Sequence, residues 1–498
     1  MNQPHQERVL ILGGGFAGLT TALHLERILA DRPDVAITLV SRDNYALFTP
    51  MLAEVAGGGI EPSHIVNPVR ASLKRTKFRE ALVWRIDLDA QVVETEHPQS
   101  HAPSALRYDC LVIALGSVTN YRAIPGVAEH AFGLKTMADA TAIRDHVLNV
   151  LEQASLVEDS AERACMLTFV IAGGGFSGAE LCGALEDYVA RALRFYPTIG
   201  RAEVRFILVH PSERLLPEVS PELAEYARLH LMERGVDVRL STRVTAATSH
   251  SATFGGEEVL THTLVWTAGT SPSPALREIA CERDGRGAIV IDDNLEVVGR
   301  PGVFALGDCA LVCDPRTGAA YPPTAQHAIR EAKTAAHNVA ATLGIGAKQP
   351  FVFDSPGALA LLGRRTAVAE VKGRRFSGFL AWWMWRTIYW LKLPRMERRI
   401  RVATDWTLDL VFPPDTVQLG AGRPPPRGRP SRARGRARRA RGELAPEHGR
   451  GQWRGRHERA GRTPARHGSI GMSATVASAI HPRPAAPLDK TVARKEPT

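Results

Sequence analysis

The chain has few of the residues that thiol-redox or metal chemistry needs. Only 6 of its 498 residues are cysteine, and no two of them form a CxxC or CxxxxC pair. Such pairs carry dithiol exchange, so their absence argues against a dithiol acceptor. No His or Cys cluster has the spacing of metal ligands, and no metal is expected. Scattered cysteines fit a reducing, cytoplasmic setting.

Long apolar runs are also missing. No segment reaches the roughly 18 uncharged apolar residues that a membrane-spanning helix needs, so any membrane contact should be peripheral. Met1–His5 leads into a strand pattern and not into an apolar signal segment.

Acidic residues are scarce only at one end. Residues 421–498 contain 17 Arg and 2 Lys against 5 acidic residues, whereas 1–420 contain 43 basic and 47 acidic residues. The net charge of +10 therefore belongs to a C-terminal tail. This tail has hardly any large apolar side chains to offset the entropy of ordering, so we expect it to be disordered.

What the chain does have is a repeated glycine pattern. Leu10–Leu25 reads LILGGGFAGLTTALHL, and 160 residues later Val170–Leu185 reads VIAGGGFSGAELCGAL. Each run combines a short strand pattern, a glycine cluster and a helix pattern, which is the opening of a dinucleotide-binding βαβ unit. Two such units predict an α/β protein with two Rossmann-like domains. Two dinucleotides in one chain imply electron transfer between them.

Other patterns set the expected domain boundaries. Apolar runs predict buried strands at Ala36–Val40, Cys110–Ala114, Phe206–Val209, Thr263–Trp266 and Val303–Leu306. Helical patterns cover Asp139–Glu158 and Pro323–Leu343. We therefore expect a first nucleotide-binding domain over 1–150 that resumes over 291–348, a second over 151–290, a C-terminal region over 349–420 and the tail over 421–498.

Each glycine of the two loops has its own task. The first permits the tight turn, the second lets the backbone approach a pyrophosphate, and the third lets the helix pack on the strand. These glycines are Gly13, Gly15 and Gly18 in the first unit and Gly173, Gly175 and Gly178 in the second.

The ribose positions depart from the usual pattern. An acidic residue that holds a ribose hydroxyl is expected after the next strand. The first unit has Ser41 and Arg42 there, which could bond a ribose and contact adenine or phosphate. The second has His210, which could accept a bond from the 2′-hydroxyl or, when protonated, favour a 2′-phosphate. The choice between NADH and NADPH stays open.

Further motifs occur in an order typical of one family: Asn44–Leu52, Ala114–Ser117, Trp266–Gly269, Phe304–Ala310 and Thr324–Ala328. From about Arg8 to Pro413 the chain resembles the type II NADH dehydrogenases, which are single-subunit, non-proton-pumping, FAD-containing NADH:quinone oxidoreductases. The resemblance implies hydride transfer from NAD(P)H to flavin N5 and then transfer of two electrons to a membrane quinone. It leaves open whether that quinone pool serves a respiratory chain.

The resemblance also implies site residues. FAD would contact the first loop including Phe16 and Ala17, with Ser41, Arg42, Thr49, Pro50, Val83, Ala114, Gly116, Gly307 and Asp308. Thr49 and Pro50 would lie beside the isoalloxazine, and Asp308 would bond the ribityl part, the alternative being a helix N-cap.

On the substrate side, the nicotinamide cofactor would meet the second loop, His210, Ala268, Gly269 and Glu180. Glu180 is expected in the first turn of its helix, pointing towards the flavin. Ala325 and Gln326 would contact flavin and quinone, and Gln326 would hold a quinone carbonyl. Glu180 and Gln326 are thus the candidate catalytic residues, and His327 is expected to be an exposed helix residue.

The segment Phe379–Leu393 predicts membrane contact. It holds four of the eight tryptophans, and residues 371–401 contain nine basic residues against Glu397 alone. Tryptophan is enriched at bilayer interfaces, and anionic lipids attract such cations. We expect a helix that lies in the interface, at the cytoplasmic face of the cell membrane. The alternative is a core helix or the interface of a homodimer.

Two other functions stay open from the sequence. One is a soluble FAD-dependent NAD(P)H reductase of a redox protein, against which the Trp-rich segment argues. The other is a flavoprotein whose tail, with its run Arg432–Arg441, binds nucleic acid by phosphate neutralisation. The tail lacks interleaved aromatic residues for base stacking, so nucleic acid is not the favoured partner.

Overall fold

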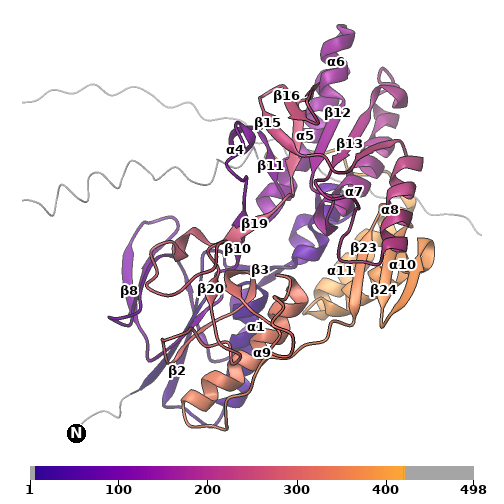
Figure 1. Cartoon of the computed structure of the whole chain (residues 1–498). Coiled ribbons are helices and arrows are strands. Elements are labelled where there is room, and N and C mark those ends of the chain that lie inside the picture. Colours follow the sequence, from indigo (N-terminus) through magenta and orange to yellow (C-terminus); the bar gives the residue numbers. More distant parts are fainter. Residues whose placement is uncertain (1–5, 419, 421–498) are drawn as a thin grey trace, which may run out of the picture. The chain divides into compact units, whose positions relative to one another are not determined.

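The computed structural model describes residues 6–418 and 420. Its framework is a pair of five-stranded parallel sheets, one for each glycine repeat (Figure 1). The strand order is β21-β9-β1-β2-β5 in the first sheet and β11-β18-β12-β13-β14 in the second. The α/β fold expected from the sequence is confirmed.

The central strands are buried on both faces, as parallel sheets require. The first sheet contains β1 (Glu7–Leu12), β2 (Val35–Ser41), β5 (Lys77–Glu80), β9 (Cys110–Ile113) and β21 (Val303–Ala305). The second contains β11 (Phe132–Gly133), β12 (Thr168–Ala172), β13 (Arg205–Val209), β14 (Val236–Arg239) and β18 (Thr263–Trp266).

Helices complete both halves. Those of the first half include α1 (Phe16–Ile28), α3 (Val69–Ser72) and α9 (Ala325–Thr342), whereas α2 (Leu52–Ala56) packs on two helices of the second half. Those of the second half include α4 (Val127–His130), α5 (Met137–Ala154), α6 (Ser160–Met166), α7 (Phe176–Ala192) and α8 (Pro221–Glu233). The alanine-rich face of α9 packs on α1, so the chain returns to the first sheet after visiting the second.

Small antiparallel sheets extend each half. The first half carries β6 (Leu82–Asp87), β7 (Val92–Glu96) and β8 (Pro103–Arg107), and the second carries β15 (Val244–Ala247), β16 (Ser251–Phe254) and β17 (Glu257–Leu260). Two further pairs join β3 (Tyr45–Leu47) to β4 (Val66–Pro68) in antiparallel and β20 (Ile289–Val290) to β22 (Ala310–Leu311) in parallel orientation.

The chain crosses between the halves earlier than the boundaries near 150 and 290. β10 (Ser117–Thr119) pairs with β19 (Thr270–Pro272), and β11 already belongs to the second sheet. The boundary at 150 placed most of α5 in the first domain, but this helix packs in the second half. Its apolar face, with Ile143 and Val147, is buried in the second half's core.

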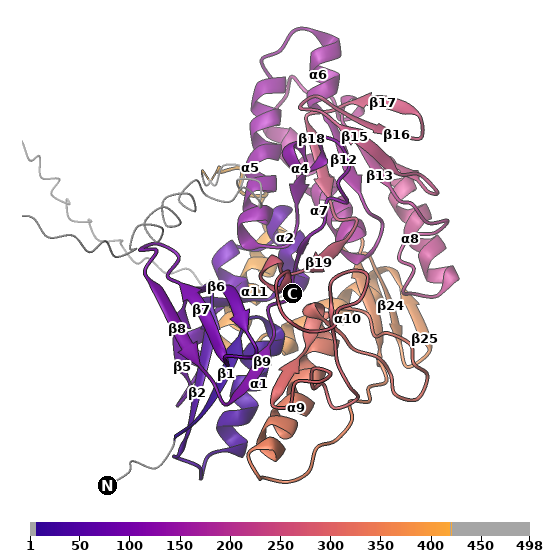
Figure 2. The ribbon, with the colours of Figure 1, turned by 60° about the vertical axis from the view of Figure 1, so that its left-hand side comes forward.

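The C-terminal region forms a small layer of its own (Figure 2). It consists of β23 (Gly357–Leu361), β24 (Ala367–Val371), β25 (Arg374–Ser377), α10 (Gly378–Lys392) and α11 (Met396–Val411). α10 packs on β24, and α11 follows after a short turn. Among the described residues, no helix combines the length and apolarity needed to cross a membrane. The tail expected to be disordered, 421–498, lies outside the described residues.

Candidate functional site

The first glycine loop joins β1 to α1 and leaves an open cradle. Gly13 N–H donates to Val40 O at 2.7 Å, and its φ of +108° is a left-handed conformation that favours glycine. A side chain at Gly18 would collide with the Gly13 carbonyl, whereas a Cβ at Gly15 would meet no atom within 4 Å. Gly15 is the N-cap of α1, and no acidic residue in the first turn neutralises that positive helix end.

The second loop repeats this geometry between β12 and α7. Gly173 has φ +118° and donates to Val209 O at 2.8 Å. A side chain at Gly178 would collide with the Gly173 carbonyl, and a Cβ at Gly175 again meets nothing within 4 Å. The sequence repeat is therefore a repeat of backbone geometry, with one open position in each loop.

Several predicted site residues meet at one edge of the first sheet. Because β2, β1, β9 and β21 are parallel neighbours, their carboxyl ends share that edge. The residues at or just after the ends of these strands are Ser41, Gly13, Ala114 to Gly116, and Gly307 with Asp308. Ligands of open α/β sheets bind in the crevice at this edge. The turn at Gly307 also packs on α1, since a Cβ there would lie 3.3 Å from Ala17 Cβ.

Asp308 links the two halves. Its Oδ2 accepts hydrogen bonds from Ser117 Oγ at 2.6 Å and from Lys135 Nζ at 2.9 Å. Lys135 follows β11 of the second sheet, so this ion pair joins the carboxyl edges of both sheets. The N-cap of the short 3-10 helix that contains Asp308 is Leu306, so the N-cap alternative for Asp308 is wrong.

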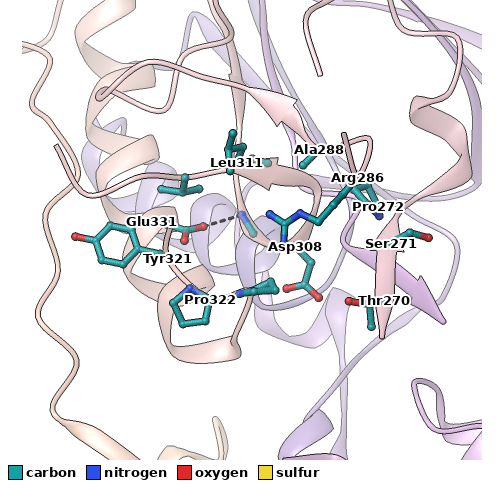
Figure 3. A pocket seen from close by; sticks show the side chains of 14 residues that line it. Thr270, Ser271, Pro272, Arg286, Ala288, Asp308, Leu311, Tyr321, Pro322 and Glu331 are labelled. Atoms are coloured by element: carbon teal, nitrogen blue, oxygen red, sulfur yellow. Dashed lines mark hydrogen bonds between the residues drawn. The ribbon is translucent and has the colours of Figure 1, made fainter. Parts of the chain in front are cut away.

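A small cleft of about 40 Å³ opens beside Asp308 (Figure 3). Thr270 and Pro272 of β19 line one part, and Pro322 and Glu331 line another. Glu331 is buried and accepts the N–H of Gly307 at 2.7 Å, the bond dashed in Figure 3. Burial raises the pKa of Glu331 to about 7. Glu331 therefore holds the turn that carries Asp308.

The two ribose positions are structurally equivalent. A Cβ on Gly14 would lie 2.7 Å from Ser41 Oγ, and one on Gly174 would lie 2.8 Å from His210 Cγ. His210 Nδ1 accepts the Gly174 N–H at 2.9 Å, and burial lowers the His210 pKa. A neutral His210, with its proton on Nε2, offers no cation to a 2′-phosphate. In the first half, Arg42 pairs with Asp43 at 2.6 Å.

Three more predicted contacts, Val83, Ala268 and Gly269, lie on or just after strands. Val83 sits half-buried on β6, beside the irregularity between β6 and β7. Ala268 and Gly269 follow β18, and Gly269 has φ +139°. The Ala268 carbonyl accepts a hydrogen bond from Arg122 Nε at 3.0 Å.

Glu180 is the fifth residue of α7, one position beyond the first turn, which corrects the sequence expectation. It is 8% exposed, and its Oε1 accepts from Leu361 N at 3.0 Å and from Trp385 Nε1 at 3.2 Å. Burial raises the pKa of Glu180 to about 8. The carboxyl group thus faces the C-terminal region and is protonated near neutral pH.

The segment 49–56, a 3-10 turn from Thr49 to Met51 followed by α2, contains the predicted Thr49 and Pro50. It also contains Glu54, which sequence reasoning missed. Glu54 is 7% exposed and accepts Trp406 Nε1 at 3.2 and 3.3 Å. No local sequence signal pairs these two residues, which lie 352 positions apart.

The N-terminus of α9 carries Ala325 and Gln326 after the N-cap Thr324. Gln326 is half-buried, and its Nε2 donates to Ser355 Oγ at 2.8 Å. His327 is only 3% exposed, and its Nδ1 lies 2.7 Å from Thr324 Oγ1. The expectation of an exposed His327 is wrong, because this face of α9 turns inward.

An open, mainly apolar cavity of about 170 Å³ lies beside the first glycine loop. Its walls come from four places: α1, the paired strands β3 and β4 with their adjoining residues, α9, and the turn between α10 and α11. They include Gly15, Phe16, Leu19, Thr20, Leu23, Phe48, Val66, Ile329, Lys392, Leu393, Pro394 and Arg398. The cavity therefore joins the first nucleotide cradle to the C-terminal helices.

The C-terminal helices have one buried and one exposed apolar face. On α10, Trp382 and Trp385 are buried in the core, whereas Trp383 is 56% exposed. The exposed large apolar residues of the helices and their ends are Phe379, Leu380, Trp383, Leu391, Met396, Ile400, Leu408, Leu410, Val411 and Phe412. One face of α10, the predicted interfacial helix, therefore belongs to the protein core, because Trp382 and Trp385 pack inward.

Both glycine loops fit dinucleotides and the described residues offer no metal centre. At Gly15 and Gly175 the backbone approaches free space that any Cβ would fill, next to a positive helix end. No group of three or more His, Cys, Asp or Glu among residues 6–418 and 420 is placed to hold a metal ion. All six cysteines are free, and Cys309 is buried as a packing residue.

Comparison with known proteins agrees with this geometry. Residues 7–332 match the family described as pyridine nucleotide-disulphide oxidoreductase, and residues 356–413 match the NDH2 C-terminal domain. The duplicated fold and the first match define the class, a pyridine nucleotide-linked flavoprotein oxidoreductase.

Individual relatives narrow the class. A probable NADH dehydrogenase of Dictyostelium discoideum is 32% identical over 414 residues, which cover 82% of this chain and 90% of the relative. The type II NADH:quinone oxidoreductase Ndh of Mycobacterium tuberculosis is 32% identical, with 81% and 88% covered. The structure of NDH2 from Plasmodium falciparum in complex with NADH shares the fold, with a TM-score of 0.76 at 18% identity over 83% of this chain and 100% of that one. The chain belongs to the type II NADH:quinone oxidoreductase family.

Proposed function

We propose that this chain is an FAD-dependent NADH:quinone oxidoreductase that works at a membrane surface without pumping protons. The observation that carries the proposal is the presence, in one chain of the type II family, of two open glycine cradles and a helix pair with exposed apolar side chains. FAD, when bound, accepts a hydride from NADH at N5 and supplies two electrons to the quinone. The protein has to bind and orient FAD, NADH and the quinone, and it has to exclude water from the site.

The first half would hold FAD. Gly13, Gly15, Gly18 and the adjacent Phe16 and Ala17 would present the N-terminus of α1 to the pyrophosphate. Asp308, oriented by Ser117 and Lys135, would accept bonds from the ribityl hydroxyls. The remaining predicted contacts are Ser41, Arg42, Thr49, Pro50, Val83, Ala114, Gly116 and Gly307, most of which follow strands of the first sheet.

The second half would hold NADH. Gly173, Gly175 and Gly178 repeat the phosphate cradle, and Ala268 with Gly269 follow the neighbouring strand. Glu180 would contact the nicotinamide as a protonated carboxyl that can donate a hydrogen bond. The neutral His210 favours NADH over NADPH, because a 2′-phosphate needs a cation there.

The apolar cavity would receive the quinone. Its walls of Phe16, Phe48, Ile329 and Leu393 suit an apolar ring and chain, and it begins at the C-terminal helices. Gln326 lies one helical turn before Ile329, and its Nε2 could exchange Ser355 for a quinone carbonyl. Ala325 would lie beside the flavin at the same helix end.

The exposed face of α10 and α11 would rest on the cytoplasmic face of an anionic membrane. Trp383 and its apolar neighbours would enter the interface, while the basic residues around Phe379–Leu393 would meet lipid phosphates. A quinone dissolved in the bilayer needs such docking to reach the cavity.

The test combines turnover with membrane binding. The purified yellow protein should oxidise NADH with a short-chain quinone as acceptor, and it should sediment with anionic vesicles. Trp383→Ser should weaken sedimentation without changing turnover with the water-soluble quinone. NADH oxidation that requires an iron–sulfur protein, together with no vesicle binding, would support a soluble reductase instead.

A further inference from the structure

Two side chains of the C-terminal helices, Trp406 and Arg386, converge on Glu54, and a third, Trp382, packs on Arg386. Trp406 Nε1 donates to both carboxylate oxygens, at 3.2 and 3.3 Å, and Arg386 Nη2 lies 3.8 Å from Oε1. The Arg386 guanidinium is sandwiched between two indoles, with its carbon 4.3 Å from the Trp382 ring centroid and 4.6 Å from that of Trp406. We name Glu54, Trp382, Arg386 and Trp406 the Glu54 cluster.

The cluster is buried and joins parts far apart in the chain. Only 8% of the Glu54 side chain and 13% of the Arg386 side chain are exposed. Glu54 belongs to α2, directly after Thr49 and Pro50, whereas its partners belong to α10 and α11. A buried ion pair between two elements is costly unless both partners are fixed, so it constrains their relative position.

This position matters because the apolar cavity lies between the same two parts. Phe48, adjacent to segment 49–56, forms one wall, and Leu393, at the end of α10, forms another. Phe48 and Tyr389 of α10 also meet edge to face with ring centroids 6.2 Å apart. A shift of α10 relative to segment 49–56 would therefore change the cavity directly.

We propose that Glu54 is a positioning residue for the acceptor half of the reaction, fixing segment 49–56 against α10 and α11 through Arg386 and Trp406. The inference rests on the proposed function, since it assigns the cavity to the quinone. It predicts that disturbing the Glu54 cluster slows electron transfer to quinone but spares flavin reduction by NADH, which takes place at the other cradle.

The charge of Glu54 gives the proposal a signature in pH. Arg386 of α10, Trp406, Asp405 and Asp409 of α11, and Glu180 of α7 act on this carboxyl group. Burial raises the Glu54 pKa to about 7 in spite of Arg386 and Trp406. The ion pair should therefore be complete above neutral pH and lost below it.

The experiment is anaerobic stopped-flow on the full-length holoenzyme, with NADH bleaching and then reoxidation by a short-chain quinone. For Glu54→Gln we expect bleaching within about twofold of wild type and reoxidation about tenfold slower at roughly pH 8.5, because small misplacements cost such factors. At about pH 6 the two proteins should be reoxidised at similar rates. Trp406→Phe, which removes only the indole donor, should show a smaller loss, and Arg386→Lys should restore most of the rate lost in Arg386→Met.

A matched control separates positioning from general loosening of α11. Arg191 Nη1 pairs with Asp409 Oδ1 at 2.5 Å, with 20% and 13% of the side chains exposed, and joins α11 to α7. Arg191 is the partner to change, because the charge of Asp409 also acts on Glu54. Arg191→Met breaks the pair, keeps the Asp409 carboxylate and should leave reoxidation unchanged.

Equal slowing in Arg191→Met, or a ratio of wild-type to Glu54→Gln rates that is flat with pH, would overturn the inference while leaving the proposed function intact. Wild-type flavin that quinone does not reoxidise would overturn the proposed function and this inference together. If Glu54→Gln loses its flavin, the reoxidation rates of Trp406→Phe, and of Arg386→Lys compared with Arg386→Met, test the inference instead.

Discussion

The two nucleotide-binding halves have the same backbone plan and different coverings. Both have five parallel strands and an open position at the second glycine. Yet α1 packs on α9 through small apolar residues, whereas α7 meets the C-terminal region, where Trp385 donates to Glu180. At the position of Glu180 the first repeat has Thr20, which lines the apolar cavity. The glycine loops thus position the dinucleotides in both halves, and the elements that cover the halves differ. The first half borders the apolar cavity, whereas in the second half α10 covers the buried acid Glu180.

Substitutions at the second glycine of each loop, Gly15 and Gly175, should reveal the largest difference between the two nucleotide-binding halves. Gly15 and Gly175 both have φ −76°, which valine adopts, and neither Cβ would touch the protein. Each valine should therefore leave the fold intact and fill one cradle. Gly15→Val should be purified without flavin, whereas Gly175→Val should keep flavin and bind NADH about a thousandfold more weakly, roughly 4 kcal/mol. Flavin absorbance and NADH titration check this, and equal flavin loss in both variants would show that the halves do not divide the cofactors.

The covering of the second half can be tested on one helix. Trp385 is 1% exposed and Trp383 is 56% exposed. Trp385→Ala should lower the free energy of unfolding by about 3–5 kcal/mol, since it leaves a large cavity beside Glu180. Trp383→Ala should change it by less than about 0.5 kcal/mol. Denaturant unfolding measures both, and similar losses would contradict the two-faced packing of α10.

Glu180 should make stability depend on pH. Its folded pKa of about 8 lies above the unfolded value near 4.3, so the folded chain keeps a proton that the unfolded chain releases. This contribution is present at low pH, and the free energy of unfolding falls as pH rises from about 4.3 to about 8. Glu180→Gln should remove about 2 kcal/mol of that fall between roughly pH 6 and pH 8. Thr20→Val, at the matching position, should leave the pH dependence as in wild type; if Glu180→Gln does so too, the carboxyl is not held protonated.

The smallest expected effect concerns the coenzyme. The wild type should prefer NADH because His210 is neutral, with Nδ1 occupied by Gly174. His210→Arg should raise the ratio of kcat/KM for NADPH to that for NADH about tenfold, roughly 1.4 kcal/mol. An unchanged ratio would place the adenosine ribose elsewhere.

The sequence predicted what short patterns encode. The glycine loops, five buried strands and the helices after them depend on neighbours within a few residues, and each lies where expected. Short patterns could not predict which side of a helix is buried, or which residues far apart in the sequence form hydrogen bonds. A helix that is apolar on most sides, such as α10, does not indicate which tryptophan turns inward, and the Lys135–Asp308 and Trp406–Glu54 bonds join residues 173 and 352 positions apart. The passage of the chain into the second half before β11 was not predicted, because the helical pattern of α5 does not indicate which of the two sheets the helix packs on.

The most direct test of the account is the pair of half-reactions of the wild-type protein under anaerobic conditions. NADH should bleach the bound flavin rapidly, NADPH should do so slowly, and a short-chain quinone should restore the yellow colour at a rate comparable to turnover. Rapid bleaching by NADH followed by no reoxidation with quinone would contradict the assignment of the apolar cavity to the electron acceptor.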